Sequence, residues 1–250
     1  MSRLRQFGKK VLPAPARRAA RRVHTFASIG IPAMYRHMFF GDTSQFGEVS
    51  ACRRLIRPDW PKYIVEVGAF DGYHLSNSYP FIQEGWEAVL VEPHPGNFTR
   101  MKARFAANPK VHCIQQACSN ISGTLPLFLE KGREERGGYS ATLSTDKNAF
   151  MDQVRSEKFI EVPVDTLSNI LSQCGAPQDM GLLSIDTEGV DFEVFEGLDT
   201  ARFRPRLIIT EEYKWEPAKH ERKYALLRER GYSFSCLVGC NSIWIANELK

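Results

Sequence analysis

From residue 62 onward, short apolar runs alternate with stretches in which apolar residues recur at helical spacing. Apolar runs bounded by Gly, Pro or Asn are typical of buried strands, and the stretches between them predict helices. We predict strands over 63–67, 88–91, 111–116, 124–129, 159–164, 182–185 and 207–210, and helices over 76–84, 97–107, 166–174, 190–198 and 219–230. This alternation implies an α/β, Rossmann-like fold, a mostly parallel sheet with helices on both faces. Segments 232–237 and 242–245 are expected to close the sheet as an antiparallel pair.

The charge of the chain is unevenly distributed. Residues 1–41 carry nine Lys or Arg and no acid, so the remaining residues hold 24 basic and 29 acidic side chains, a net charge of −5. We therefore expect a basic N-terminal extension over 1–41, helical in part over 23–40, and one domain over 42–250. Three interpretations of residues 1–22 stay open: a solvated tail, an organelle presequence, or a peripheral contact with an anionic membrane. The acidic domain disfavours a nucleic-acid partner.

Cysteine spacing and apolar run length indicate the compartment. The six cysteines are scattered without the spacing of zinc ligands, and reduced thiols in a cytosolic protein are the simpler interpretation. No segment reaches the roughly 18 uninterrupted apolar residues that a membrane span requires. We predict a cytoplasmic location, with peripheral attachment to the inner face of a membrane as the alternative. The sequence does not indicate an oligomeric state.

A glycine turn with an acid inside it follows the first predicted strand, as Glu66-x-Gly68-x-x-Asp71-Gly72. A dinucleotide site would place backbone N–H groups against a pyrophosphate, and Asp71 would repel that phosphate. A ligand with a ribose and a positive end but no phosphate suits the turn better, and S-adenosylmethionine (SAM) has this chemistry. We predict that Glu66 and Asp71 accept hydrogen bonds from its amino group, while Gly68 and Gly72 let the backbone approach it. A plain β-turn with a solvated aspartate is the alternative.

Two further strand ends complete the predicted cofactor site. Glu92 ends the strand after the turn, where a carboxylate accepts hydrogen bonds from ribose hydroxyls. Ala117 and Cys118 follow the third predicted strand, and small residues there would leave room for a flat adenine ring. Both positions also have simpler interpretations, a strand-end acid that caps the next turn and an ordinary junction between strand and loop.

A second acidic segment follows strand 182–185. Asp186 and Glu188 lie at its carboxyl end, and Glu211 ends the next strand. Ligands of open parallel sheets bind at that edge, so we predict all three as catalytic candidates, with Asp186 also contacting the cofactor. His74, just past the glycine turn, is a fourth candidate as a base. Alternatively, the acids stabilise the N-terminus of helix 190–198, hold a divalent cation or bind sugar hydroxyls, and His74 lies on the surface.

These motifs together resemble the FkbM family of SAM-dependent methyltransferases, over about 44–246. The resemblance rests on Ser44-Gln45 with Gly47-Glu48, Val65-Glu66-Val67-Gly68-Ala69-Phe70-Asp71-Gly72 with Ser76-Asn77-Ser78, Val91-Glu92-Pro93, Ala117-Cys118-Ser119 with Gly123, Val164-Asp165-Thr166-Leu167, Ile185-Asp186-Thr187-Glu188-Gly189, Gly197-Leu198 and Glu211. Ser184 and Asp191 depart from the common Lys and Glu of the family. The resemblance implies a class I methyltransferase fold and O-methylation of a hydroxyl, often on a sugar, glycolipid or natural product.

The implied reaction is in-line transfer of the sulfonium methyl group to the hydroxyl of a small-molecule or carbohydrate acceptor. The alcohol must lose its proton to Asp186, Glu211 or His74, or be acidified by a bound cation, and the sequence does not choose among these. A charged loop over 131–138 is predicted either to close over the substrate with Tyr139 or to be a plain surface loop. Two alternatives remain: an NAD-dependent oxidoreductase, disfavoured by the missing G-x-G-x-x-G, and a non-catalytic SAM-binding module that docks a partner or membrane through its basic N-terminus.

Overall fold

The computed structural model describes residues 41–135, 137–143, 155–212 and 217–249. The predictions for residues 1–40, the basic extension and its partly helical segment, lie outside these ranges. Within the described ranges, no helix has the length and apolar character needed to cross a membrane.

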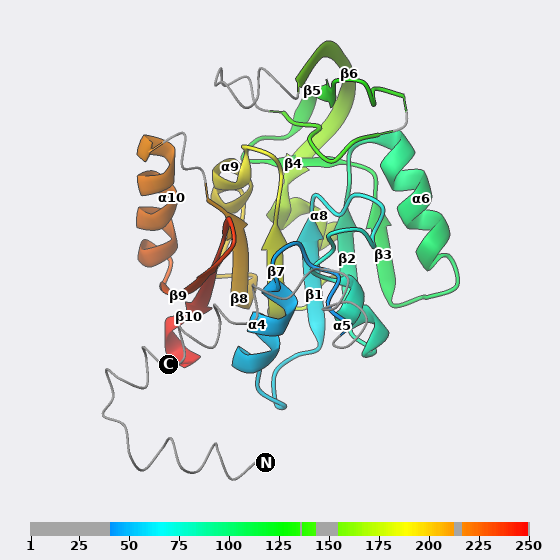
Figure 1. Cartoon of the computed structure of the whole chain (residues 1–250). Coiled ribbons are helices and arrows are strands. Elements are labelled where there is room, and N and C mark those ends of the chain that lie inside the picture. The colour runs from blue at the N-terminus through cyan, green and yellow to red at the C-terminus, as the bar shows by residue number, and fades with distance from the viewer. Residues whose placement is uncertain (1–40, 136, 144–154, 213–216, 250) are drawn as a thin grey trace, which may run out of the picture.

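A seven-stranded sheet forms the centre of the domain (Figure 1). Its strand order is β3-β2-β1-β7-β8-β10-β9. The strands are β1 (Tyr63–Val67), β2 (Glu87–Val91), β3 (Val111–Ile114), β7 (Asp179–Ile185), β8 (Arg204–Glu211), β9 (Tyr232–Val238) and β10 (Asn241–Ala246). The first five in this order pair in parallel, whereas β10 is antiparallel to both β8 and β9. The predicted parallel sheet and its antiparallel closing pair are therefore confirmed.

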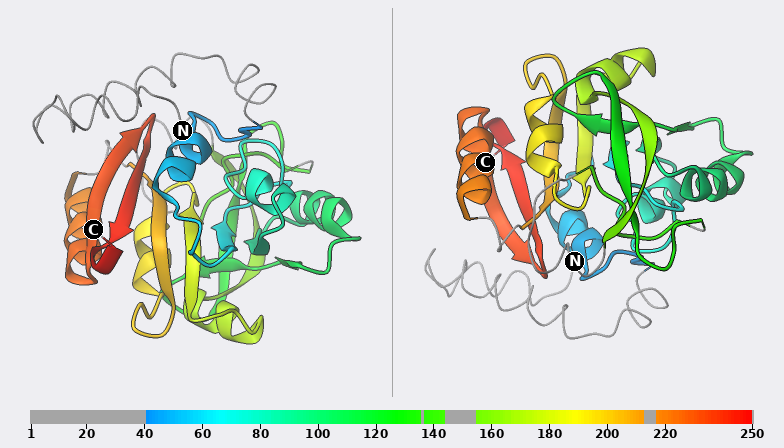
Figure 2. Two further views of the ribbon diagram at one scale, coloured as in Figure 1. Left: turned by 90° about the horizontal axis from the view of Figure 1, so that it is seen from below. Right: turned by 90° about the horizontal axis from the view of Figure 1, so that it is seen from above.

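Helices cover both faces of this sheet, as the alternating pattern predicts (Figures 1 and 2). One face is covered by α8 (Leu167–Gln173), α9 (Asp191–Glu196) and α10 (Pro217–Glu229). Leu171, Phe195 and Leu227 are their buried contacts with the sheet. The other face is covered by α4 (Glu48–Leu55), α5 (Tyr79–Gln83) and α6 (Pro95–Phe105), which bury Val49, Phe81 and Met101. Strands buried on both faces read as continuous apolar runs, and this is why the sequence pattern located them.

A second, three-stranded sheet corrects the prediction for the middle of the chain. It contains β4 (Ala117–Ser119), β5 (Gly123–Glu130) and β6 (Arg155–Thr166) in the order β4-β6-β5. The third predicted strand leaves the main sheet after residue 114, and Ala117 pairs in parallel with Val164 of β6 instead. β5 and β6 are antiparallel to each other and stand above the main sheet in Figure 1. An apolar pattern identifies a strand without naming its partner, so the sequence could not separate the two sheets.

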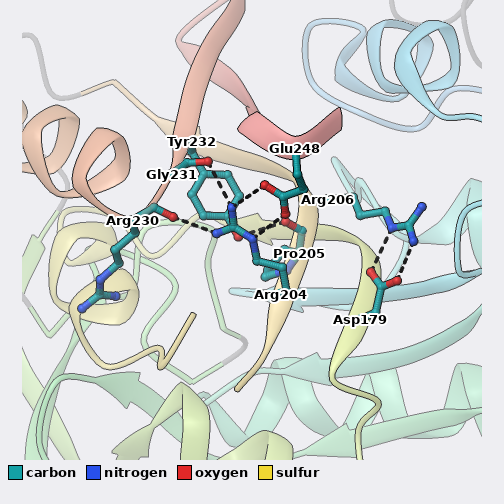
Figure 3. Close-up of polar contacts among 8 residues, drawn as sticks. All are labelled: Asp179, Arg204, Pro205, Arg206, Arg230, Gly231, Tyr232 and Glu248. Carbon is teal, nitrogen blue, oxygen red and sulfur yellow. Dashed lines mark hydrogen bonds and ion pairs between the residues drawn. The ribbon is translucent and has the colours of Figure 1, made fainter. Parts of the chain in front are cut away.

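Arg204, the first residue of β8, fastens the closing strand pair to the sheet (Figure 3). Its guanidinium donates to the carbonyls of Arg230 at 2.7 Å and Gly231 at 3.1 Å, and it forms an ion pair with Glu248 at 2.8 Å. Glu248 belongs to the short C-terminal 3-10 helix η1 (Asn247–Leu249). These contacts lie at the amino end of β8, so they stabilise the fold at the edge opposite to the carboxyl ends of the parallel strands.

Candidate active site

The turn after β1 is built around Gly68. Its φ is +85°, and a Cβ at this position would lie 1.7 Å from the backbone oxygen of Asp186. The N–H groups of Gly68 and Ala69 both donate to the Val91 carbonyl at 3.0 Å. Glycine is therefore required because the turn lies directly against the ends of β2 and β7. Gly68 also lines the pocket described below, so its predicted approach to a ligand stays a prediction.

The carboxylate of Glu66 accepts hydrogen bonds from the segment that joins β1 to α5. Its carboxylate accepts hydrogen bonds from the Ser76 hydroxyl at 2.8 Å, the Ser78 hydroxyl and the Asn77 N–H at 2.6 Å. Burial raises the pKa of Glu66, and these donors oppose the shift. The three donors explain why α5 begins at Tyr79 and not at the predicted residue 76. Glu66 is absent from the lining of the pocket described below.

Asp71 closes its own turn. It accepts hydrogen bonds from the N–H groups of Tyr73 at 3.0 Å and His74 at 2.9 Å, and its second oxygen lies 2.7 Å from Nδ1 of His74. Burial raises the pKa of Asp71, but the hydrogen bonds from His74 and Tyr73 outweigh it and hold the pKa below its usual value. A Cβ at Gly72 would meet the Phe105 ring at 2.6 Å. Asp71, Gly72 and His74 do not line the pocket, and the His74 side chain is 55% exposed.

Glu92, at the end of β2, presents its carboxylate to a pocket at the carboxyl edge of the sheet. The carboxylate accepts hydrogen bonds from the N–H groups of Phe70 at 3.0 Å and His94 at 2.8 Å, and from the Asn97 amide at 3.2 Å. Burial nevertheless raises the pKa of Glu92 to about 7. Oε2 accepts from the Phe70 N–H and, as a carboxylate oxygen with two lone pairs, can also accept from a ligand hydroxyl. This is the position predicted for ribose binding.

The pocket extends from Glu92 toward the second sheet. Ala117 and Cys118 of β4 line it together with apolar side chains, as predicted for an adenine site. Burial raises the pKa of the Cys118 thiol far above its usual value, so this thiol is neutral and acts as a small apolar group. The remaining lining residues come from β1, β2 and β7 with the turns that follow them, from α6, the β3–β4 junction, β5 and segment 138–143: Val67, Gly68, Phe70, Val91, Pro93, Asn97, Gln116, Leu127, Gly138, Tyr139, Ala141, Leu143, Asp186, Thr187, Glu188 and Val190.

The segment after β7 brings two carboxylates to the opposite side of the same pocket. Asp186 and Glu188 both line it, and Glu188 adopts a left-handed backbone with φ of +54°. Burial, and then the neighbouring charges of Glu188 and Asp191, raise the pKa of Asp186 well above its usual value. Burial and the charge of Asp191 raise the pKa of Glu188 to about 7. A strained residue and two perturbed acids in one pocket mark a candidate catalytic centre.

Asp191, the first residue of α9, holds the segment after β7 through hydrogen bonds. The sequence pattern did not predict this role. Its fully buried carboxylate accepts hydrogen bonds from Thr187 N–H at 2.9 Å and Thr187 hydroxyl at 2.6 Å. The second oxygen accepts from Thr210 hydroxyl at 3.0 Å and from Glu211 N–H at 2.9 Å. One carboxylate thus joins the pocket residue Thr187 to the end of β8. The signal in the sequence was an acid at the start of a helix, which also fits a simple helix-end role.

Glu211 lies near this network but does not line the pocket. Burial, and then the charges of Asp186, Glu188 and Asp191, raise its pKa to about 10, so Glu211 is protonated at neutral pH.

Across the described part of the chain, no group of three or more His, Cys, Asp or Glu is arranged to hold a metal ion. The divalent cation therefore stays a prediction.

Segment 137–143 covers the pocket on the side of β5. The Tyr139 ring stacks on Phe70 with centroids 4.2 Å apart. The Asn97 amide donates to the Gly138 carbonyl at 3.2 Å, and the Thr142 hydroxyl donates to the Glu188 carbonyl at 2.6 Å. The two ends of the segment are thereby joined to α6 and to the catalytic segment. Of the two interpretations of this region, cover or plain surface loop, the contacts of Tyr139 support the cover.

The lining matches the charge and shape of SAM. It contains three carboxylates, those of Glu92, Asp186 and Glu188, and its described members include no Lys or Arg that would pair with a phosphate. Glu92 offers an acceptor for hydroxyls, β4 and the aromatic rings of Phe70 and Tyr139 border space for a flat base, and the two acids after β7 favour a positive charge. When bound, SAM supplies a methyl group on a cationic sulfur.

The sheet order with its single antiparallel strand β10, and a pocket of this chemistry at the carboxyl edge, define a class I SAM-dependent methyltransferase. The family model of the methyltransferase FkbM domain matches residues 66–234, and the chain belongs to this family. The resemblance noted in the sequence is thereby confirmed, and the NAD-dependent oxidoreductase alternative is rejected.

Solved structures with a similar fold are distant in sequence. Precorrin-6y C5,15-methyltransferase from Geobacter metallireducens shares 9% identity at a TM-score of 0.42, over 80% of this chain and 87% of that chain. Aeropyrum pernix fibrillarin with natively bound S-adenosyl-L-methionine shares 10% at 0.43, over 79% and 73%. A methyltransferase from Geobacter sulfurreducens shares 14% at 0.41, over 98% and 95%. No curated protein sequence matches the chain.

Proposed function

We propose that the protein transfers the methyl group of SAM to a hydroxyl oxygen of a small molecule, sugar or glycolipid. The observation that carries the proposal is the pair of acids after β7. Asp186 and Glu188 line the same pocket as Glu92. An alcohol needs a proton acceptor as it attacks, and this pair offers one beside the expected acceptor position.

Glu188 is the better base of the two at neutral pH. Its pKa of about 7 leaves a large fraction of the carboxylate ionised, whereas burial and the neighbouring acids raise the pKa of Asp186 well above its usual value. A base is most effective when its pKa lies near the working pH. In this assignment Glu188 accepts the hydroxyl proton, and Asp186 lies beside it in the same pocket lining.

His74 and Glu211 are weaker candidates on geometry. His74 is engaged with Asp71 outside the pocket lining, and Glu211 is protonated at neutral pH and lies behind the lining. Positioning of the acceptor hydroxyl against the methyl group then contributes most of the rate enhancement, since the methyl donor is already activated.

The test is an acceptor screen over neutral sugars, glycosides and glycolipids, read as release of S-adenosylhomocysteine and as a new methoxy signal in the product. We expect Glu188→Gln to lower kcat by about 10²- to 10⁴-fold, the usual contribution of a general base, with SAM affinity retained. The matched control is Glu196→Gln, an exposed acid of α9 outside the lining. A wild-type protein that binds SAM and methylates amine or carbon acceptors while leaving every hydroxyl unmodified would contradict the proposal.

A further inference from the structure

Lys223 of α10 is a buried cation beneath the pocket. It is 1% exposed, and among the described residues it is the only Lys or Arg that is buried. Its ammonium donates to the Thr210 hydroxyl at 3.3 Å and to the Glu211 carbonyl, and it lies 4.0 Å from a Glu212 oxygen. A buried ammonium is costly unless it is paired and hydrogen-bonded, so this position has a specific requirement for it.

The contacts of Lys223 overlap those of Asp191. The Thr210 hydroxyl and the Glu211 carbonyl, both in β8, accept hydrogen bonds from Lys223. The same Thr210 hydroxyl and the Glu211 N–H donate hydrogen bonds to Asp191. The charge of Asp191 also acts on Lys223, where it opposes the lowering of the lysine pKa by burial. Asp191 in turn accepts both donors of Thr187, a lining residue of the pocket.

The network lies in a strongly acidic region. Titratable or charged groups face it from every element packed around it: Glu48 of α4, Glu66 of β1, Asp186 and Glu188 after β7, Asp191 and Glu193 of α9, Glu211 and Glu212 of β8, Lys219 and His220 of α10, and Cys240 in the β9–β10 turn. Lys219 contacts the Gly189 carbonyl at 2.7 Å and Glu193 at 2.9 Å. Lys223 is therefore the cation placed between the buried acids and the end of β8.

We propose that Lys223 is a positioning residue for the methyl transfer, because its ammonium fixes Asp191 and through it the pocket residue Thr187. Lys223 is not itself a lining residue of the pocket. In this role Lys223 keeps the segment that carries Asp186 and Glu188 at a fixed distance from the end of β8. The inference rests on the proposed function only in naming the reaction that this segment serves.

The experiment measures amide hydrogen exchange by ¹⁵N NMR in the wild type, Lys223→Met and Lys223→Arg, at a temperature where all three are folded. We expect Lys223→Met to speed exchange of the Thr187 and Glu211 amides by tenfold or more relative to the Leu183 amide in β7, which reports global stability. Lys223→Arg keeps the charge, so it is expected to remain within about threefold of the wild type. Arg228→Met, an exposed cation on the same helix, is the control.

A merely structural lysine would change all three amides together, and that result would overturn the proposal. If Lys223→Met does not fold, Lys223→Gln replaces it, because its amide keeps a polar donor without the charge on a side chain that is one bond shorter. With an acceptor in hand, Lys223→Met should also lower kcat by at least tenfold while SAM affinity changes by less than threefold. The exchange measurement uses no activity, so its failure is distinguishable from failure of the proposed function.

Discussion

Two acid-bearing turns lie side by side at the carboxyl edge of the sheet, and they use their acids differently. After β1, Asp71 accepts hydrogen bonds from its own turn, and its pKa is held below the usual value. After β7, Asp186 and Glu188 line the pocket, and burial among like charges raises their pKa values. An acid that accepts hydrogen bonds from its own turn outside the pocket stabilises structure, whereas an acid that lines the pocket among like charges is poised for a ligand.

The largest expected effect comes from the place where the two turns touch. Gly68→Ala would put a Cβ 1.7 Å from the Asp186 backbone oxygen. Neither backbone can move without breaking the sheet, so we expect a loss of at least about 3 kcal/mol of unfolding free energy, or no folded protein. Urea denaturation measures this loss.

Gly85→Ala provides the matched control for this prediction. Gly85 has nearly the same φ, +86°, but a Cβ added there would have no atom within 4 Å. It should lose only the left-handed backbone cost of about 1–2 kcal/mol. Equal losses in the two variants would show that the contact with Asp186 is unimportant.

Opposite effects on stability are expected from neutralising one acid in each turn. Asp71→Asn keeps the shape but removes a charged acceptor of three hydrogen bonds, so the unfolding free energy at pH 7 should fall by about 1–3 kcal/mol. Glu188→Gln should instead stabilise the SAM-free protein at pH 8 by about 1–3 kcal/mol, because it removes an ionised buried carboxylate. Destabilisation by Glu188→Gln at pH 8 would contradict the contrast between the turns.

The pH dependence of this stabilisation follows from the direction of the pKa shift. The pKa of Glu188 is about 7 in the folded protein against an ordinary value of 4.5, so the folded state holds the proton more tightly. The unfavourable contribution of Glu188 is absent below pH 4.5, grows as the pH rises to 7, and is constant above. Urea denaturation at pH 5 and pH 8 should therefore show a larger gain from Glu188→Gln at pH 8.

The smallest effect concerns the cover of the pocket. Tyr139→Ala removes the ring that stacks on Phe70 at 4.2 Å. Tyr139 lines the pocket, and an aromatic contact with the adenine would contribute about 0.5–1.5 kcal/mol, so SAM affinity should fall by about two- to tenfold. Phe159→Ala, an aromatic of β6 that is 53% exposed and outside the lining, should leave the affinity unchanged. Equal affinities for Tyr139→Ala and the wild type would show that the cover does not contact the cofactor.

The sequence was most informative where a single chemical requirement decides the structure. Buried parallel strands read as apolar runs, so β1 and β2 were predicted to within one residue, whereas β7 and β8 each begin three residues before the predicted start. Strand ends at one edge also placed Glu92, Asp186 and Glu188 in one pocket. The partners of β4 and β6 were not predictable, because an apolar pattern does not specify which strand it pairs with.

Side-chain partners inside the turns could not be predicted either. Glu66 accepts a hydrogen bond from Ser76, and this contact depends on the residue at which α5 begins. The exact start of a helix is poorly predicted from local sequence. The role of Asp191 depends on donors from Thr210 and Glu211, which are distant in the sequence. The cofactor assignments of Glu66, Asp71 and Gly72 and the catalytic assignments of Glu211 and His74 stay predictions, and the structure places all five outside the pocket lining.

Calorimetric titration with SAM, using the wild type, Glu92→Gln and Asp71→Asn, tests most directly the central claim that acids of the pocket lining bind the cofactor and the acid of the turn after β1 does not. We predict that Glu92→Gln weakens binding by about 1–3 kcal/mol, since the ribose hydroxyls lose a charged acceptor, while Asp71→Asn changes SAM affinity by less than threefold once its folding is verified. A folded Asp71→Asn variant that loses as much affinity as Glu92→Gln would contradict this contrast, and so would a folded wild-type protein that binds no SAM.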